Sequence, residues 1–568
     1  MGIVTSASGF SLSMAACFAV GSLMARVAAH AFPVADASSP SVETNAPQAT
    51  ESDLQHQLQL QSGFGAAAGP GWTFVPQLAL NELFTDNILN TETNRRWDLL
   101  TLLTPGILIN GDVPNAQVRL NYGPQFRLAA RTPEVNDVTQ QLLGTGQFTI
   151  IPDEFFVDAR AVAGSSPVGS GFGALGLGVT TPTLGPPSLS GLGTAALAKQ
   201  NQVQTSSASI APYWLHRFGD IGIAKVGYQF NETSFSQSSS FLPLFFSHGN
   251  SSAYNSTNEA IAQFQTGDRL TPIQDLATLD GVVGNGTGVN AGSHQYVALN
   301  RLGYSIDRSL TGFGEIGYED LRFGGVPVTT IADAVWGLGG IWQPNADSRI
   351  TAEYGHRYGA RNVAVDASYA LTARTRISAR YQTGLQSDLQ TIQSQLDLVS
   401  LDATGQAVDS QTGAPLFIGT GGLGFQNGLF RTRTMTATST TVLDRDQVSV
   451  SFVWSRNTTV ATVPPDQRNL FGIPAPPVGS NGEAETVYMT WIHQLSEVLL
   501  LSSGAAYSTS RVSPSGAQQS VAASVGMQYE FGETVTGTAR YTYLNRISDT
   551  PGQSFYQNVF LVGLSKSF

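Results

Sequence analysis

The sequence predicts an all-β protein: a transmembrane, antiparallel, up-and-down β-barrel of about 20 strands, within a range of 18 to 22. Three observations support this prediction. Apolar and polar residues alternate along many segments of about 11–14 residues, which is long enough to cross a bilayer when the strand is tilted. The connections between these segments alternate between short turns and longer loops, as they do in outer-membrane barrels. Aromatic residues gather near the segment ends, where the two membrane interfaces would lie.

The composition excludes several other classes. The chain has 568 residues with 12% charged, 41% hydrophobic, 60 Gly and a single Cys, and its formal net charge is −12. Typical globular chains have about twice this share of charged residues. The acidic balance argues against a nucleic-acid partner, and one cysteine cannot build a disulfide scaffold. After the N-terminus no apolar run approaches the roughly 20 residues that a transmembrane helix needs.

The N-terminus reads as an export signal. Residues 10–24 are apolar and are followed by Ala29-His30-Ala31, which has the pattern of a cleavage site. No Lys or Arg precedes the apolar stretch, so a misassigned start or a signal anchor remains the alternative. Cys17 lies within this signal, where attachment of a lipid is the weaker interpretation. The predicted organisation is a signal peptide over 1–31, a periplasmic linker over 32–71 and an outer-membrane barrel over 72–568.

The alternation is clearest near the C-terminus. Residues 520–531 place Val521, Val525, Met527 and Tyr529 on one face and Ser520, Ser524 and Gln528 on the other. The same period predicts the strands 72–84, 97–110, 116–131, 138–150, 155–163, 206–217, 220–232, 294–306, 309–322, 332–344, 347–358, 361–372, 375–387, 430–443, 446–458, 484–495, 498–511, 518–531, 534–547 and 555–568.

The last strand carries a candidate barrel-insertion signal. It ends with apolar residues at every second position and a terminal aromatic: Phe560, Val562, Leu564 and Phe568. Lys566 departs from this pattern, but a Lys near the interface can extend its amine into water. The barrel-assembly machinery is therefore an expected partner.

The first two predicted strands contain a set of residues that resembles a known family. The set is Pro76, Glu82, Thr85, Asp86, Asn87, Pro105 and Gly106. It resembles the outer-membrane proteins associated with PEP-CTERM/exosortase and exopolysaccharide loci, over roughly 50 residues. The resemblance implies an outer-membrane location and a connection with exopolysaccharide, and it implies no mechanism. Asp and Asn in residues 85–87 suit the turn into the first external loop, and a ligand or cation site is the alternative.

The polar faces of the strands predict the lumen wall. The basic candidates are Arg119, Arg127, Arg131, Arg160, Lys225, Arg301, Arg349, Arg357, Arg376, Arg380 and Arg540. The acidic candidates are Asp158, Glu315, Glu319, Glu353, Asp366 and Glu530. The predicted wall is thus net basic by about five charges, which would favour anions. Four of the arginines, at positions 349, 357, 376 and 380, could form one selective patch, or they could pair with Glu353 and Asp366 and only brace the wall.

A porin-like channel, as an accessory of exopolysaccharide export, is the function that these patterns favour. The loops at 164–203 and 234–292, the second with a short helix near 257–266, are candidates to fill the lumen. If one fills it completely, the barrel would instead be structural or adhesive. An outer-membrane enzyme is the weakest alternative because neither a nucleophile motif nor a metal-ligand spacing occurs. A TonB-dependent transporter is disfavoured because the stretch before Trp72 is short for a plug domain.

The expected partners follow from this location. They are outer-membrane lipid and lipopolysaccharide, the barrel-assembly machinery and components of exopolysaccharide secretion, with no nucleic acid, no metal and no cofactor. The patterns leave open the solute, the oligomeric state and the gating.

Overall fold

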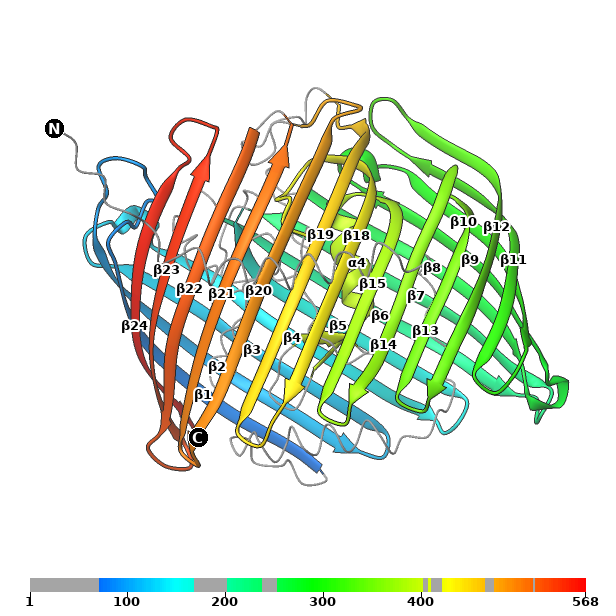
Figure 1. Ribbon diagram of the computed structural model, residues 1–568, viewed down its shortest axis with the longest axis horizontal. Helices are drawn as coiled ribbons and strands as arrows, with labels where there is room; N and C mark the ends of the chain where they lie inside the picture. The colour runs from blue at the N-terminus through cyan, green and yellow to red at the C-terminus, as the bar shows by residue number, and fades with distance from the viewer. Residues whose placement is uncertain are drawn as a thin grey trace.

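The computed structural model describes residues 71–167, 202–236, 253–401, 407–409, 421–464, 475–513 and 516–568. Within these ranges the chain forms one antiparallel sheet of 22 strands, in which each strand pairs with its neighbours in the chain and β1 pairs with β24 (Figure 1). This closed, up-and-down barrel confirms the predicted fold class. The predicted signal peptide and residues 32–70 of the linker lie outside the described residues.

The strands are β1 (Gly71–Thr85), β2 (Asp98–Val113), β3 (Ala116–Ala129), β4 (Asp137–Ile151), β5 (Phe155–Pro167), β6 (Gln202–Arg217), β7 (Gly222–Ser236), β8 (Ala253–Thr266), β9 (Ile273–Gly286), β10 (Ser293–Ser305), β11 (Leu310–Phe323), β12 (Thr329–Asn345), β13 (Ser348–Arg357), β14 (Ala360–Thr372), β15 (Thr375–Gln386), β18 (Gly428–Val442), β19 (Asp446–Thr462), β20 (Asn481–Ser496), β21 (Leu499–Val512), β22 (Gly516–Glu530), β23 (Val535–Ser548) and β24 (Phe555–Ser567). A small hairpin of β16 (Val399–Leu401) and β17 (Ala407–Asp409) lies in the connection from β15 to β18.

The hairpin of β8 and β9 corrects one prediction. The sequence predicted a long loop over 234–292 with a short helix near 257–266, but residues 253–286 supply two wall strands. The alternation was hard to see because the outward positions of β8 include Ser256, Asn258 and Ala260, which are polar or small. Since the two strands were missed as a pair, the predicted directions of all the other strands remain correct.

The outer surface of the barrel is that of a protein in a membrane. On β1, Trp72, Phe74 and Leu80 are exposed, whereas Gln77 between them is buried. A soluble protein would bury the aromatic set and expose the polar one. The same inversion recurs around the barrel, on Ile316 and Leu338 for example, which are 70% and 67% exposed. An apolar outer band of this kind is the signature of a transmembrane barrel.

The two ends of the barrel differ in the connections that they carry. At one end, which we call the short-turn end, neighbouring strands are joined by two to six residues, as at 114–115, 346–347 and 373–374. The opposite, long-loop end carries the long connections, including 387–427 between β15 and β18. The start of β1 and the C-terminus both lie at the short-turn end (Figure 1). This asymmetry matches the predicted alternation of short turns and long loops. It also distinguishes the two ends of the lumen.

A helix lies inside the barrel. The helix α4 (Asp388–Asp397) follows β15 directly, yet it contacts β5, β6, β7 and β8. These strands are seven to ten positions from β15 around the ring of 22, so they form the opposite wall. Figure 1 shows α4 between the two walls. Among the residues that the structure describes, no helix combines the length and the apolar character needed to cross a membrane.

Candidate functional site: the lumen and the barrel seam

The lumen wall contains a guanidinium that joins three strands. Arg301 on β10 donates from Nε to Glu315 Oε2 on β11 at 3.0 Å and from Nη2 to Glu353 Oε2 on β13 at 2.9 Å. The Glu353 side chain reaches across β12 because position 337 is glycine, where a Cβ would overlap Glu353 Oε1. The two carboxylates are almost fully buried. These three predicted lumen residues therefore brace the wall.

Three of the four arginines predicted to form one patch lie near each other. Arg380 on β15 forms an ion pair with Asp366 on β14 at 2.6 Å. Arg376 donates to Ser368 Oγ at 3.1 Å, and Arg349 is opposite Ser368 in the β13–β14 register. The fourth, Arg357, is at the long-loop end of β13, where it lies near Glu319 on β11. The single patch of four is therefore wrong, because eight residues of extended strand separate positions 349 and 357 by roughly 26 Å.

The remaining predicted basic residues divide between the lumen and the rim. Arg119 on β3 and Arg540 on β23 are on the lumen faces of their strands, and Arg127 is buried opposite Asp137 of β4. Lys225 lies 4.4 Å from the centre of the Tyr213 ring. The prediction fails for Arg131. It follows the end of β3, and its guanidinium lies 4.0 Å above the exposed ring of Trp97 on the outside.

The predicted basic excess of the lumen is not retained. The hairpin of β8 and β9 adds Glu259 and Asp280 to the inner face, β4 adds Asp137, and α4 adds Asp388 and Asp397. Among the basic residues, Arg546 on β23 is added to the lumen face, whereas Arg131 lies at the rim and is removed from it. These further carboxyls offset the predicted excess of about five. The error follows from the missed hairpin and from an internal helix that the strand pattern could not show.

Side-chain amides attach α4 to the opposite wall. Asn255 Nδ2 on β8 donates to Gln393 Oε1 at 2.9 Å, and Gln393 Nε2 donates to Thr257 Oγ1. Gln229 Nε2 on β7 donates to Asp397 Oδ1 at 2.7 Å. These contacts are polar, and each could be exchanged for a contact with water. The helix also buries Leu389, Ile392 and Leu396, so apolar packing holds it in the lumen together with these polar bonds.

The start of α4 is well defined. Ser387 caps the helix by accepting from Gln390 N, and the Gln390 side chain accepts from Ser387 N, which makes a capping box. Ser387 Oγ also donates to Asn290 Oδ1 at 2.9 Å. Asp388 accepts from Gln426 N at 2.6 Å, and this bond holds the returning end of the loop against the helix.

Both terminal carboxyls of α4 hold their protons more tightly than an exposed Asp. Burial raises the pKa of Asp388 to about 7, against the weaker opposing effect of the Gln426 N–H. Burial raises the pKa of Asp397 to about 6, with Arg160 and Gln229 opposing the shift. Near neutral pH the attachment of α4 is therefore sensitive to protonation.

The predicted motif at residues 85–87 closes the barrel. The β1–β24 ladder ends where Thr85 is opposite Val559, and side chains continue it from there. Asp86 accepts from Asn558 N at 2.8 Å and from Asn558 Nδ2 at 2.7 Å. Asn87 Nδ2 donates to the Tyr556 carbonyl at 3.0 Å. We call this set of contacts between residues 85–87 and 556–558 the seam clasp.

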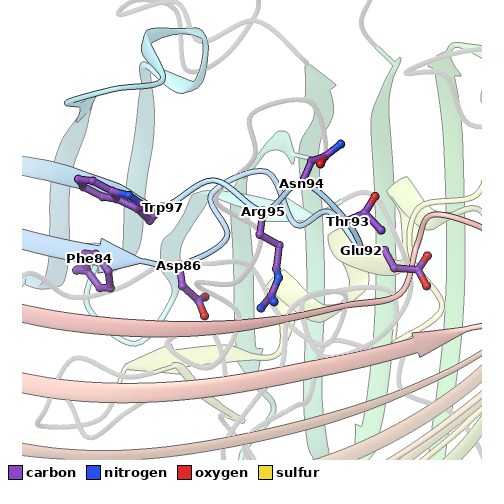
Figure 2. A pocket seen from close by; sticks show the side chains of 7 residues that line it. All are labelled: Phe84, Asp86, Glu92, Thr93, Asn94, Arg95 and Trp97. Atoms are coloured by element: carbon purple, nitrogen blue, oxygen red, sulfur yellow. The ribbon is translucent and has the colours of Figure 1, made fainter.

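The seam clasp borders an open depression on the outside of the barrel. Figure 2 shows its lining, with Phe84 and Trp97 side by side and with Asp86 and Arg95 directed toward the last strands. The Arg95 guanidinium lies 3.9 Å above the Tyr556 ring on β24. Asn87 also accepts from Thr91 N at 3.0 Å, so the residues make the predicted turn in addition to closing the seam.

The other motif residues have backbone roles. The Pro76 carbonyl accepts from Phe568 N at 2.9 Å, which extends the seam to the C-terminus. Pro105 and Gly106 lie at an interruption of the β2–β3 ladder, since proline has no N–H to donate. Glu82 accepts from Thr101 Oγ1 at 2.8 Å. The predicted insertion signal is on the outer face of β24, where Phe560, Val562, Leu564 and Phe568 are all about half exposed or more.

Within the described part of the chain, no group of three or more His, Cys, Asp or Glu is placed to hold a metal ion. His356 bonds Asp333 and His493 bonds Asp446, each at 2.8 Å, and these strand-end pairs belong to separate parts of the barrel. Most of the predicted loop 164–203, residues 168–201, lies outside the described residues.

Comparisons with known proteins give similarities of fold. No protein-family model matches the sequence, and a search of the curated proteins finds no match. Among solved structures, the siderophore receptor PirA from Acinetobacter baumannii is 9% identical, with 89% of this chain and 81% of that chain covered and a TM-score of 0.45. The FrpB iron transporter from Neisseria meningitidis is 10% identical, with 89% and 83% covered and a TM-score of 0.48. The ferripyoverdine receptor of Pseudomonas aeruginosa is 10% identical, with 88% and 72% covered and a TM-score of 0.44.

Proposed function

We propose that the protein is an outer-membrane channel for small polar solutes whose lumen is narrowed by α4. The closed barrel and its apolar outer band support a membrane location, and the predicted signal peptide supports export to a Gram-negative outer membrane. The short-turn end would face the periplasm. A barrel of 22 strands encloses a space far wider than a small solute, so a structure inside the lumen must control passage.

The position of α4 is the observation on which this proposal depends. The helix has ten residues, about 15 Å in length. It leaves the wall at β15 and is attached to β7 and β8 on the opposite side. Solutes must therefore pass beside α4. Charged and polar groups line this passage, which suits a hydrated solute rather than an apolar one.

Removing α4 should increase conductance. In planar bilayers, we expect the full-length protein to conduct and a variant with residues 388–426 replaced by a short Gly/Ser linker to conduct at least about twice as much. Equal conductance of the two proteins would contradict a constriction at α4. If neither protein conducts, the barrel is closed by other means and the structural or adhesive alternative gains support.

A matched pair of point variants tests the attachment itself. Gln393→Ala removes two bonds to β8, whereas Ser394→Ala removes only a bond to the Thr391 carbonyl within the helix. In planar bilayers, we expect channels of the Gln393→Ala variant to open more often than wild-type channels. Channels of the Ser394→Ala variant should match the wild type. Unboiled samples of both should keep the faster migration of a folded barrel on a detergent gel.

Ion selectivity should depend on Arg376 more than on Arg380. In the described residues Arg376 has no carboxylate within 4 Å, so its charge faces the lumen unopposed. Arg376→Gln should therefore lower the anion preference, measured as a reversal potential in a salt gradient. The control is the double variant Arg380→Gln with Asp366→Asn, which removes a matched pair and should change the potential little. The opposite ranking would contradict this assignment.

The proposed connection with exopolysaccharide export depends only on the resemblance of residues 72–111 to the exosortase-associated family. The polar passage beside α4 suits hydrated solutes in general and does not depend on this connection. Partner capture with exopolysaccharide-secretion components would test the connection, and it is independent of the conductance experiments.

A further inference from the structure

We infer that the outer face of β18 to β21 binds the phosphate groups of a phosphorylated glycolipid of the outer leaflet, which in a Gram-negative envelope is lipopolysaccharide. The inference rests on four charged residues that the strand register brings to one level. We call them the charged row: Arg433 on β18, Arg456 on β19, Glu483 on β20 and Arg511 on β21.

The register places the charged row in one line across four strands. Arg433 is opposite Arg456, Arg456 is opposite Glu483, and Glu483 is opposite Arg511. All four side chains are exposed. Since neighbouring strands are about 4.8 Å apart, the row is roughly 15 Å wide. That width matches a sugar headgroup with more than one phosphate better than it matches a single small anion.

The charged row lies at the height of the lipid headgroups. Arg456 follows the first residue of β19 by ten positions, which corresponds to roughly 25 Å along the membrane normal for a tilted strand. This is the height of the apolar band in such barrels. Below the row, Val450, Phe452 and Trp454 are on the same outer face. Trp454 stacks on Tyr381 at 6.4 Å, and this pair marks the interface on the long-loop side.

The arginines of the row have donors to spare. None of the three forms an ion pair within 4 Å among the described residues. Glu483 instead accepts from Trp454 Nε1 at 3.0 Å. Glu485 lies one step lower, opposite Trp454, so the net charge of the region is still positive. Guanidinium groups bind phosphate oxygens through two parallel bonds, which makes a phosphate the best match for these groups.

The inference rests on the proposed outer-membrane location, and binding assays test it without reference to conductance. Full-length protein, refolded in detergent free of lipopolysaccharide, is titrated with lipid A that has two phosphates and with the same lipid A after dephosphorylation. Native mass spectrometry should show at least tenfold tighter binding of the phosphorylated form. Equal binding of the two lipids would overturn the inference without any mutation.

Variants locate the binding to the row. The triple variant Arg433→Gln, Arg456→Gln, Arg511→Gln should bind phosphorylated lipid A at least tenfold more weakly. The control removes three exposed arginines near the short-turn end, Arg217→Gln, Arg308→Gln and Arg445→Gln, and should bind like the wild type. An equal loss in both variants would show a dependence on overall charge and would overturn the assignment. If the triple variant does not fold, Arg456→Gln alone is compared with Arg445→Gln.

Discussion

Asn87→Ala should destabilise the closed barrel by about 3 kcal/mol, because it leaves several buried backbone groups at the seam without partners. Asn87 is fully buried and bonds the Thr91 N–H, the Thr91 carbonyl and the Tyr556 carbonyl. Gln557, also fully buried, donates to Thr85 Oγ1 and to the Asn87 carbonyl. The seam depends on these groups, because the two strands that meet there come from opposite ends of the chain.

The measurement is the temperature at which unboiled protein loses its fast mobility on a detergent gel. The matched control is Asn136→Ala, which removes a bond to Ala129 N at the same end of the barrel. That bond joins β3 and β4, strands connected by a short loop, so its loss should cost only about 1 kcal/mol. Adding Asp86→Ala to Asn87→Ala should lower the temperature further. A larger effect at Asn136 than at Asn87 would contradict the role of the seam clasp.

The alternation of residues was sufficient to predict most of the wall. All 20 predicted strands occur, with ends shifted by a few residues. This works because lipid outside and a polar lumen inside impose opposite demands on successive residues. It failed at β8, where Asn258 and Glu259 are adjacent and small residues occupy the outer face. At β8 the difference in polarity between the two faces is too small for the alternation to be recognised.

The helix α4 could have been predicted from other signals. Ser387 and Gln390 have the spacing of a capping box, and Leu389, Ile392 and Leu396 repeat with a helical period. No sequence pattern indicates that this helix turns inward, because its partners on β7 and β8 lie more than 130 residues away. The same limit applies to the seam clasp, whose partners are about 470 residues apart.

Charge placement depends on register, which the sequence does not show. The alternation correctly puts Arg301, Glu315 and Glu353 on the lumen face. Arg301 can bind both carboxylates only because four strands pair in this exact register and position 337 is a glycine. The charged row on the outside has the same origin. Its members are ordinary exposed residues of separate strands until the register aligns them.

Conductance should rise between pH 5 and pH 8, because α4 detaches more readily as its carboxyls ionise. Burial raises the pKa of Asp388 to about 7 and that of Asp397 to about 6, whereas both would be near 4 in a detached, hydrated loop. The attached state therefore holds more protons over this range, and raising the pH weakens it. For the two carboxyls together the loss is several kcal/mol. At Asp397, Arg160 opposes the effect, whereas the repulsion between Asp397 and Glu259 adds to it. Asp280 and Lys225 act in turn on Glu259, with opposite signs.

Variants separate this titration from other effects of pH. Asp388→Asn with Asp397→Asn should keep α4 attached at pH 8, so that conductance stays at its low value across the range. The control is Asp307→Asn in the short turn after β10, where hydrogen bonds from Ser309 hold the pKa of the carboxyl below its usual value. That group is ionised throughout the range, so the variant should show the pH dependence of the wild type. A fall in wild-type conductance with rising pH would contradict the sign of the coupling, since ionisation of a buried carboxyl can only favour the state that hydrates it.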